Sequence, residues 1–130
     1  LAEGATEVAA RYAVERSQFG KAISTFQGIQ FMLADMLMGL ETARSLVYRA
    51  ARMQDQDHPS VRRYASMAKC YASEMAMRVT TDAVQMMGGY GYMKDYPVER
   101  MMRDAKVLQI FEGTNQIQRM IIARDYLDSL

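Results

Sequence analysis

The sequence predicts an all-α protein, an up-down four-helix bundle with additional short helices. Apolar residues recur at helical spacing over long segments, half of the residues are hydrophobic, and only 2 of 130 are proline. The 13 methionines suit the irregular gaps between packed helices. A chain of this length can bury a substantial core, so a single domain over residues 1–130 is expected.

The first helix is expected to be short. Its apolar pattern runs from Leu1 to Val14 and then stops at a polar segment, residues 16–21, which is expected to form a loop with Gly20 at its turn. Because the helical pattern is already under way at Leu1, we expect this sequence to be part of a longer protein.

Two long antiparallel helices are expected next. The first runs from about Phe26 to Met53, roughly 42 Å at the standard helical rise, and the second from Pro59 or Ser60 to about Met87. The residues expected to face the core are Ile29, Leu33, Met36, Leu40, Ala43, Val47 and Ala50 in the first helix, and Ala65, Ala68, Ala72, Met75, Val79, Ala83 and Met86 in the second. We interpret them as core packing and not as a ligand pocket.

Two shorter helices complete the predicted bundle. The glycine-rich segment 88–92 is interpreted as a helix C-cap followed by a flexible turn, because no strand precedes it as a dinucleotide-binding loop requires. Pro97 is expected to open a short helix that runs to about Asp104. Thr114 or Asn115 is expected to cap a last helix that ends near Leu127.

Composition excludes several classes of function. The net charge is only +1 and the charges are interspersed, so no nucleic-acid partner is expected. Cys70 and His58 are the only residues of their types, which leaves no disulfide and no metal-ligand set. Charges interrupt every long apolar stretch, so no membrane insertion is expected. We interpret His58 as a solvated turn residue and Cys70 as inert packing.

Glu112 is the candidate for chemistry. It lies on a short turn just before the last helix, followed by Gly113, which lets the backbone pass close to a ligand. A carboxylate on such a corner can reach a bound substrate. A solvated glutamate that only favours the helix N-terminus electrostatically would give the same local pattern.

Three segments in a fixed order resemble the C-terminal helical domain of the acyl-CoA dehydrogenases, of the short- or medium-chain type. They are Arg16-Ser17-Gln18-Phe19-Gly20-Lys21 with Gln27, then Gln85-Met86-Met87-Gly88-Gly89-Tyr90-Gly91-Tyr92 with Tyr96-Pro97-Val98-Glu99-Arg100, and finally Arg103-Asp104-Ala105-Lys106 followed by Phe111-Glu112-Gly113-Thr114. The resemblance covers essentially the entire chain. It implies a flavoenzyme whose N-terminal helical domain and middle β-domain lie outside this sequence.

The resemblance implies that Glu112 removes the α-proton of a fatty acyl-CoA, while FAD accepts the β-hydrogen as hydride and a trans-2-enoyl-CoA forms. The backbone N–H of the base is implied as a donor to the thioester oxygen, and Gly113 as the residue that leaves room for the thioester. Phe111 departs from the family pattern, in which tyrosine is common at this position.

The resemblance also implies an FAD site with an electron-transfer flavoprotein as acceptor. Arg16 would meet the FAD pyrophosphate, Phe19 and Gln27 would pack along its adenosine side, and the remaining cofactor contacts would be Gln85, Gly88, Gly89, Thr114 and Gln116. Some of these residues reach the FAD of a neighbouring subunit, which implies a homodimer or homotetramer. The expected location is the cytoplasm in a bacterium or the mitochondrial matrix in a eukaryote.

A hypothesis from a different class is also compatible with the sequence. A bundle of 130 residues without a complete cofactor site can serve as a helical oligomerisation or interaction module with no catalysis of its own. Every candidate site residue would then be a helix cap or a solvated polar group.

Overall fold

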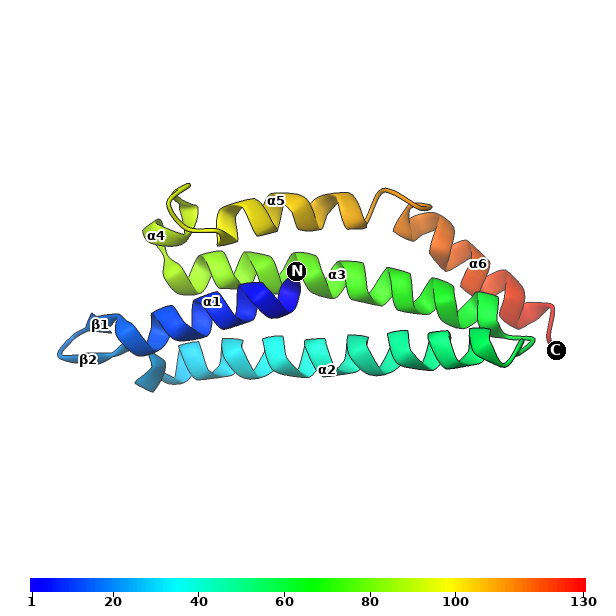
Figure 1. Ribbon diagram of the computed structural model, residues 1–130, viewed down its shortest axis with the longest axis horizontal. Coiled ribbons are helices and arrows are strands. Elements are labelled where there is room, and N and C mark those ends of the chain that lie inside the picture. Colours follow the sequence, from blue (N-terminus) through cyan, green and yellow to red (C-terminus); the bar gives the residue numbers. More distant parts are fainter.

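The computed structural model describes residues 1–130, and most of them lie in helices. The major helices are α1 (Ala2–Glu15), α2 (Gln27–Asp55), α3 (Val61–Met87), α5 (Val98–Leu108) and α6 (Asn115–Leu127). Figure 1 shows α2 and α5 on opposite sides of α3, with α6 continuing along the same side as α5. Glu112 lies in the connection between α5 and α6. The predicted all-α up-down bundle is confirmed.

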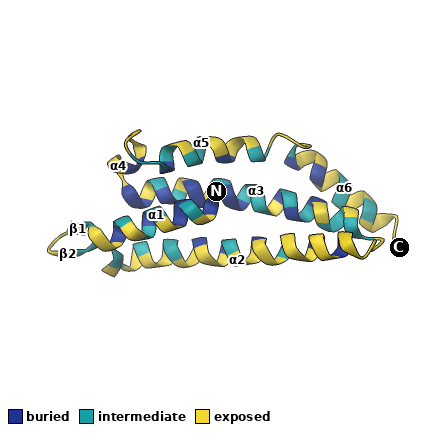
Figure 2. Ribbon diagram, in the orientation of Figure 1, coloured by how far each residue is buried: buried dark blue, intermediate teal, exposed yellow.

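Helix α3 is the centre of the bundle. It packs against α1, α2, α5 and α6, and Figure 2 shows that α2, although slightly longer, presents one side to solvent. The core contains many small residues, which let helix backbones approach closely. Its members include Ala2, Ala5, Ala9 and Ala13 from α1, Met36 and Ala43 from α2, and Met75, Val79, Ala83 and Met86 from α3. The interpretation of these methionines and alanines as core is confirmed, but Ala43 and Met75 also line a pocket, so the expectation that they form no pocket is wrong for these two.

Two expected core positions are wrong. Val47 is 43% exposed and lines an open pocket together with Leu1 and Ala2, where α1 begins. Ala65 is exposed in the first turns of α3. Helical periodicity shows which residues share a face but does not show how far along the helix a neighbour extends.

Three segments have more regular structure than expected. The segment after Arg16 is a small hairpin, β1 (Ser17–Gln18) with β2 (Lys21–Ala22), followed by the 3-10 turn η1 (Ile23–Thr25). Its two-residue turn has positive φ at Phe19 (52°) and Gly20 (78°), the geometry that a tight hairpin favours. The segment expected to be a flexible turn forms the short helix α4 (Gly89–Tyr92) after the C-cap at Gly88. Helix α5 continues to Leu108, one turn beyond the expected Asp104.

Candidate active site

Glu112 lies on the exposed turn between α5 and α6. Its φ is 53° and that of Gly113 is 87°, so two consecutive residues adopt the left-handed conformation. This conformation is readily available to glycine but costs an ordinary side chain on the order of 1 kcal/mol or more. Thr114 ends the turn as the N-cap of α6, and its hydroxyl accepts a hydrogen bond from the backbone N–H of Ile117 at 3.4 Å. Of the two expected caps, Thr114 is therefore the observed one.

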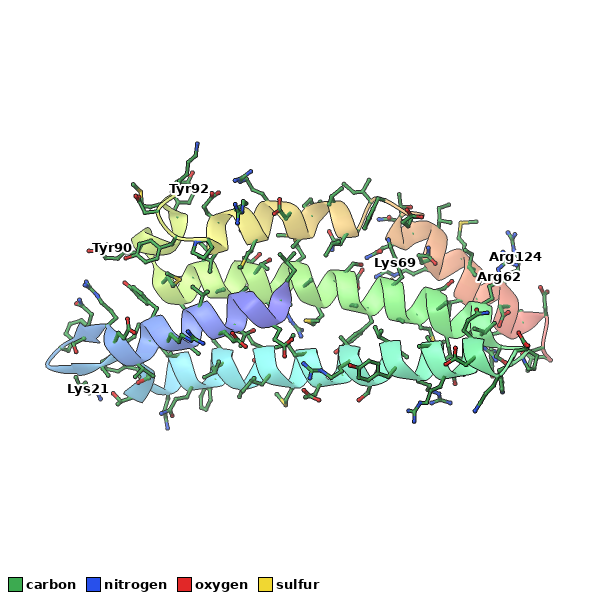
Figure 3. The ribbon with its side chains drawn as sticks, in the orientation of Figure 1. Lys21, Arg62, Lys69, Tyr90, Tyr92 and Arg124 are labelled. Atoms are coloured by element: carbon green, nitrogen blue, oxygen red, sulfur yellow. The ribbon has the colours of Figure 1, made fainter.

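Side chains from two helices hold the backbone of this turn. The Gln118 side-chain amide of α6 donates to the carbonyl oxygen of Glu112 at 3.0 Å. The Lys69 ammonium of α3 donates to the carbonyl oxygen of Gly113 at 2.6 Å, and Figure 3 shows Lys69 between α3 and the α5–α6 connection. The backbone N–H of Asn115 closes the turn by donating to the Gln109 carbonyl at 3.1 Å.

A buried polar cluster lies beneath the turn, around Asn115. The Asn115 side-chain oxygen accepts from Lys69 at 2.8 Å, and its amide nitrogen donates to the Ser73 hydroxyl at 2.8 Å. The Cys70 thiol is buried beside it, and this burial raises the pKa of the thiol, which disfavours the reactive thiolate. Every buried polar side-chain atom in the structure has a partner, so hydrogen bonds within the cluster offset the cost of removing its polar groups from water.

Glu112 borders the larger of two pockets that are relevant to the predicted chemistry. The pocket has a volume of about 650 Å³, and 11 of its 16 lining residues are hydrophobic, among them Leu40, Met75 and Phe111. The Glu112 backbone N–H has no hydrogen-bond partner within the chain. The turn thus presents a carboxylate and a free backbone donor at the edge of an apolar pocket.

A second pocket brings together Arg16, Gln85, Gly88 and Gly89, which come from segments about 70 residues apart in the sequence. Its volume is about 430 Å³. The Arg16 guanidinium lies over the Tyr90 ring, with its central carbon 5.3 Å from the ring centroid. Gly88 has a φ of 59°, and a Cβ there would meet nothing within 4 Å, so its backbone faces open space. This end of the bundle offers a cation and exposed backbone to a ligand.

Aromatic side chains support the Arg16 pocket. The rings of Tyr12, Tyr90 and Tyr96 form a mutual cluster with centroids 5.8–6.3 Å apart. Burial raises the pKa of the Tyr12 hydroxyl, and the nearby Arg16 charge partly opposes this increase. The cluster holds Tyr90 beneath the guanidinium.

The other predicted contact residues lie in two separate places. Phe19 is 92% exposed at the hairpin turn, and Gln27 is exposed at the first position of α2, at the same end as Arg16. Thr114 and Gln116 lie at the start of α6, beside Glu112. Helix α1 borders the Glu112 pocket at its first turn and the Arg16 pocket at its last, which places the two pockets roughly 20 Å apart.

Comparison with known proteins identifies the family. The sequence profile described as "Acyl-CoA dehydrogenase, C-terminal domain" matches residues 1–127. The chain belongs to the acyl-CoA dehydrogenase family. The "Probable acyl-CoA dehydrogenase fadE25" of Mycobacterium leprae is 55% identical over 127 residues, covering 98% of this chain and 33% of that protein.

Solved structures share the fold of this acyl-CoA dehydrogenase domain. Butyryl-CoA dehydrogenase from Megasphaera elsdenii superposes with a TM-score of 0.94 at 52% identity, covering 97% of this chain and 33% of that one. A chain from a structure described as "Electron transferring flavoprotein of Acidaminococcus fermentans" superposes with the same TM-score at 56% identity and the same coverage. The domain therefore spans about a third of the length of the proteins it matches.

Residues that hold the Glu112 turn of this acyl-CoA dehydrogenase domain are absent from the sequence-based prediction. Lys69, Ser73 and Gln118 each have a polar side chain in an amphipathic helix, which is unremarkable locally. Two of them contact the turn and its cluster across more than 40 residues of sequence. No helix in the structure combines the length and the hydrophobicity that crossing a membrane requires.

Proposed function

We propose that this domain supplies the catalytic base and part of the FAD site of an acyl-CoA dehydrogenase that converts a fatty acyl-CoA to a trans-2-enoyl-CoA. The observation that carries the proposal is the left-handed turn that presents Glu112 at the edge of a largely apolar pocket. The family membership of the chain supports it. A carboxylate beside an apolar cavity suits a substrate that combines an acyl chain with a weakly acidic proton.

In this proposal the Glu112 carboxylate removes the proton at the α-carbon of the thioester. The backbone N–H of Glu112 stabilises the negative charge that develops on the thioester oxygen. That N–H has no partner within the chain, so it is available to donate. The apolar pocket excludes water from the acyl chain. FAD, when bound, supplies the acceptor for the hydride that leaves the β-carbon.

The residues present fit an FAD dinucleotide. Arg16 can make charge-assisted bonds to a pyrophosphate, and the exposed backbone at Gly88 and Gly89 lets phosphate or sugar approach closely. Gln85 lines the same pocket, and Phe19 and Gln27 lie at the same end of the bundle for the adenosine side. Thr114 and Gln116 lie roughly 20 Å away beside Glu112.

This separation of the cofactor contacts favours an oligomer. We propose that Thr114 and Gln116 contact the FAD that serves Glu112 of the same chain, while Arg16, Gly88 and Gly89 contact the FAD of a neighbouring subunit. The assembly is proposed to be a homodimer or homotetramer. Exposed apolar side chains on α2, Phe31 at 65% and Met38 at 60%, suit burial against another copy or another domain.

The proposed substrate is a short- or medium-chain linear acyl-CoA, and the proposed electron acceptor is an electron-transfer flavoprotein. Glu112 occupies the position of the base that the resemblance assigns to these types. Support also comes from relatives: the Megasphaera enzyme is a butyryl-CoA dehydrogenase, and a Clostridium acetobutylicum relative, 51% identical, is described as short-chain specific.

The decisive experiment replaces the base in the complete enzyme. Glu112→Gln keeps the size of the side chain but removes the basic group, so FAD content and acyl-CoA binding are expected to remain. Flavin reduction by butyryl-CoA, followed by anaerobic stopped-flow absorbance, is expected to slow by at least about 10²-fold. Glu7→Gln, at an exposed position of α1, is the matched control and is expected to react like wild type.

A Glu112→Gln enzyme that reduces its flavin within twofold of the wild-type rate would overturn the assignment of the base. It would leave Glu112 as a solvated residue near a helix N-terminus, worth only a few tenths of a kcal/mol to the helix. The alternative hypothesis of an oligomerisation module without catalysis would then be the better account of this domain.

A further inference from the structure

We propose that Lys69 and Gln118 are positioning residues for the base: together they hold the Glu112 turn in its left-handed conformation and so aim the carboxylate and the backbone N–H of Glu112. The inference rests on the proposed function, in which Glu112 removes the proton. It adds two side chains that do not touch the substrate and act through the backbone of the turn.

The two contacts fix two consecutive peptide planes. Gln118 donates to the carbonyl oxygen of Glu112 at 3.0 Å, and Lys69 donates to the carbonyl oxygen of Gly113 at 2.6 Å. The donors come from different helices, α6 and α3. Since each peptide unit is planar, fixing both carbonyl directions restricts the ψ of Glu112 and both torsions of Gly113. These torsions decide where the Glu112 side chain points relative to α6.

The turn needs such restraint because its own sequence does not supply it. Gly113 is compatible with many backbone conformations, and the left-handed conformation at Glu112 is unfavourable for a residue with a Cβ. Without external contacts the turn would populate other conformers, and the carboxylate would spend less time in the productive direction. The charged donor of Lys69 makes the stronger of the two bonds.

Asn115 places the Lys69 ammonium. Its side-chain oxygen accepts from Lys69 at 2.8 Å, while its amide nitrogen donates to Ser73 one turn further along α3. Lys69 forms no salt bridge in the chain, so its charge is directed at two neutral oxygens, both at the turn. A lysine committed in this way has a geometric role that a surface lysine lacks.

Gly113 is also required for the Gln118 contact. A Cβ built at Gly113 would lie 2.9 Å from the Gln118 side-chain nitrogen, closer than carbon and nitrogen can pack. The glycine therefore serves two purposes, the positive φ and the approach of Gln118 to the neighbouring carbonyl. The same close approach shows that Gln118 is packed directly against the turn, at 9% exposure.

The test uses Lys69→Met and Gln118→Met in the complete holoenzyme. Each replacement removes one donor to the turn and keeps an unbranched side chain. The control is Lys106→Met, since Lys106 lies in the last turn of α5 and its ammonium bonds only to the Gln109 side chain. The readouts are flavin reduction by butyryl-CoA in anaerobic stopped flow, KM, and the isotope effect with α-deuterated butyryl-CoA.

Both donor variants are expected to slow flavin reduction about 10- to 10²-fold, because a misplacement of the base near 1 Å costs rate on that scale. KM is expected to change less than threefold, since substrate binding is not the step affected. The deuterium isotope effect is expected to rise, because proton removal limits the rate more fully. Lys69→Arg, which keeps a charged donor, is expected to recover part of the lost rate.

The outcomes separate this inference from the proposed function. If Glu112→Gln abolishes reduction but both donor variants react within twofold of wild type, the positioning role is wrong and the base assignment stands. If Glu112→Gln reacts normally, the proposed function itself fails. A loss of thermal stability without any change in rate or isotope effect would show a purely structural role and would also overturn the inference. If Lys69→Met does not fold, the result for Gln118→Met alone tests the positioning role.

Discussion

The Glu112 turn and the Arg16 end of the bundle are organised by different kinds of contact. At the turn, side chains from α3 and α6 donate hydrogen bonds to two backbone carbonyls, and a buried asparagine completes the cluster. At the Arg16 end, the hairpin and the C-cap at Gly88 shape the backbone, and the guanidinium lies over an aromatic ring without an acidic partner.

The Glu112 turn is positioned by the chain itself, whereas the Arg16 end leaves its polar groups available to a ligand. The backbone that carries the Glu112 carboxylate is held by side chains of the same chain. Arg16 keeps all of its charge available, because a ring face attracts the cation without occupying its N–H donors in an ion pair. The first region is suited to chemistry that depends on direction, and the second to holding an anion.

The largest expected effect on stability comes from breaking the cluster below the turn. Asn115→Leu removes an acceptor of Lys69 and the donor to Ser73, so Lys69 keeps only the Gly113 carbonyl and the Ser73 hydroxyl only the Cys70 carbonyl as partners. The expected loss is on the order of 3 kcal/mol, measured as a fall in the melting temperature of the complete enzyme at saturating FAD. Gln54→Leu, at an exposed position of α2, is the control. An unchanged melting temperature would show that the cluster does not anchor the turn.

The sequence predicts more of the fold than of the polar cluster around Asn115. Periodicity over 27–29 residues predicts α2 and α3 because each turn of a long helix repeats the same local signal. The cap at Thr114 is also a local feature. The contacts of Lys69 with Gly113 and Asn115 join residues 44 and 46 apart, and nothing near Lys69 in the sequence marks it.

The candidate site divides in the same way. Glu112 and Gly113 stand out because a carboxylate and a glycine precede a helix cap, and the roles of Arg16 and Gly88 come from a family resemblance. Arg16 and Gly88 line one pocket because α1 packs against α3, and local sequence patterns do not describe this packing. The roles proposed for the ten site residues stay predictions.

The Arg16 end is tested by Arg16→Ala in the complete enzyme. If its role is a pyrophosphate contact, the loss of charge-assisted hydrogen bonds is expected to weaken FAD binding by on the order of 1.5–3 kcal/mol. Flavin content after extensive dialysis and a direct titration with FAD measure this loss. At saturating FAD the rate of flavin reduction is expected to stay near wild type. Flavin retention equal to wild type would contradict the assignment, and Arg11→Ala, exposed on α1, is the control.

A smaller effect is expected from the ring beneath Arg16. Tyr90→Leu keeps an apolar side chain but removes the cation–π contact, whose distance of 5.3 Å lies within the favourable range. An exposed contact of this kind contributes about 0.5–1 kcal/mol, so FAD affinity is expected to fall roughly two- to fivefold. Tyr92→Leu, 78% exposed and outside the aromatic cluster, is the control. Equal FAD affinities for the two variants would remove Tyr90 from the support of Arg16.

The smallest effect concerns Asp82, which lies on α3 between the two regions. Burial raises the pKa of its carboxyl; Arg78 opposes this increase and Asp35 adds to it. Because the pKa is higher in the folded than in the unfolded protein, the folded state binds the proton more tightly. The contribution of Asp82 to stability is therefore greatest below its ordinary pKa and is lost as the pH rises through the raised value.

At neutral pH Asp82 is thus a partly buried charge that lowers stability, and Asp82→Asn is expected to raise the melting temperature by up to about 2 °C. The difference from wild type is expected to shrink as the pH is lowered through the raised pKa of Asp82, where the wild-type carboxyl becomes protonated. Asp57→Asn is the control, because Asp57 is exposed and its left-handed turn accepts asparagine equally well. A lower melting temperature for Asp82→Asn at pH 7 would show that the Asp82 charge is stabilised by Arg78 and not penalised by burial. Either way, neither flavin retention nor the rate of flavin reduction is expected to change, since Asp82 borders neither pocket.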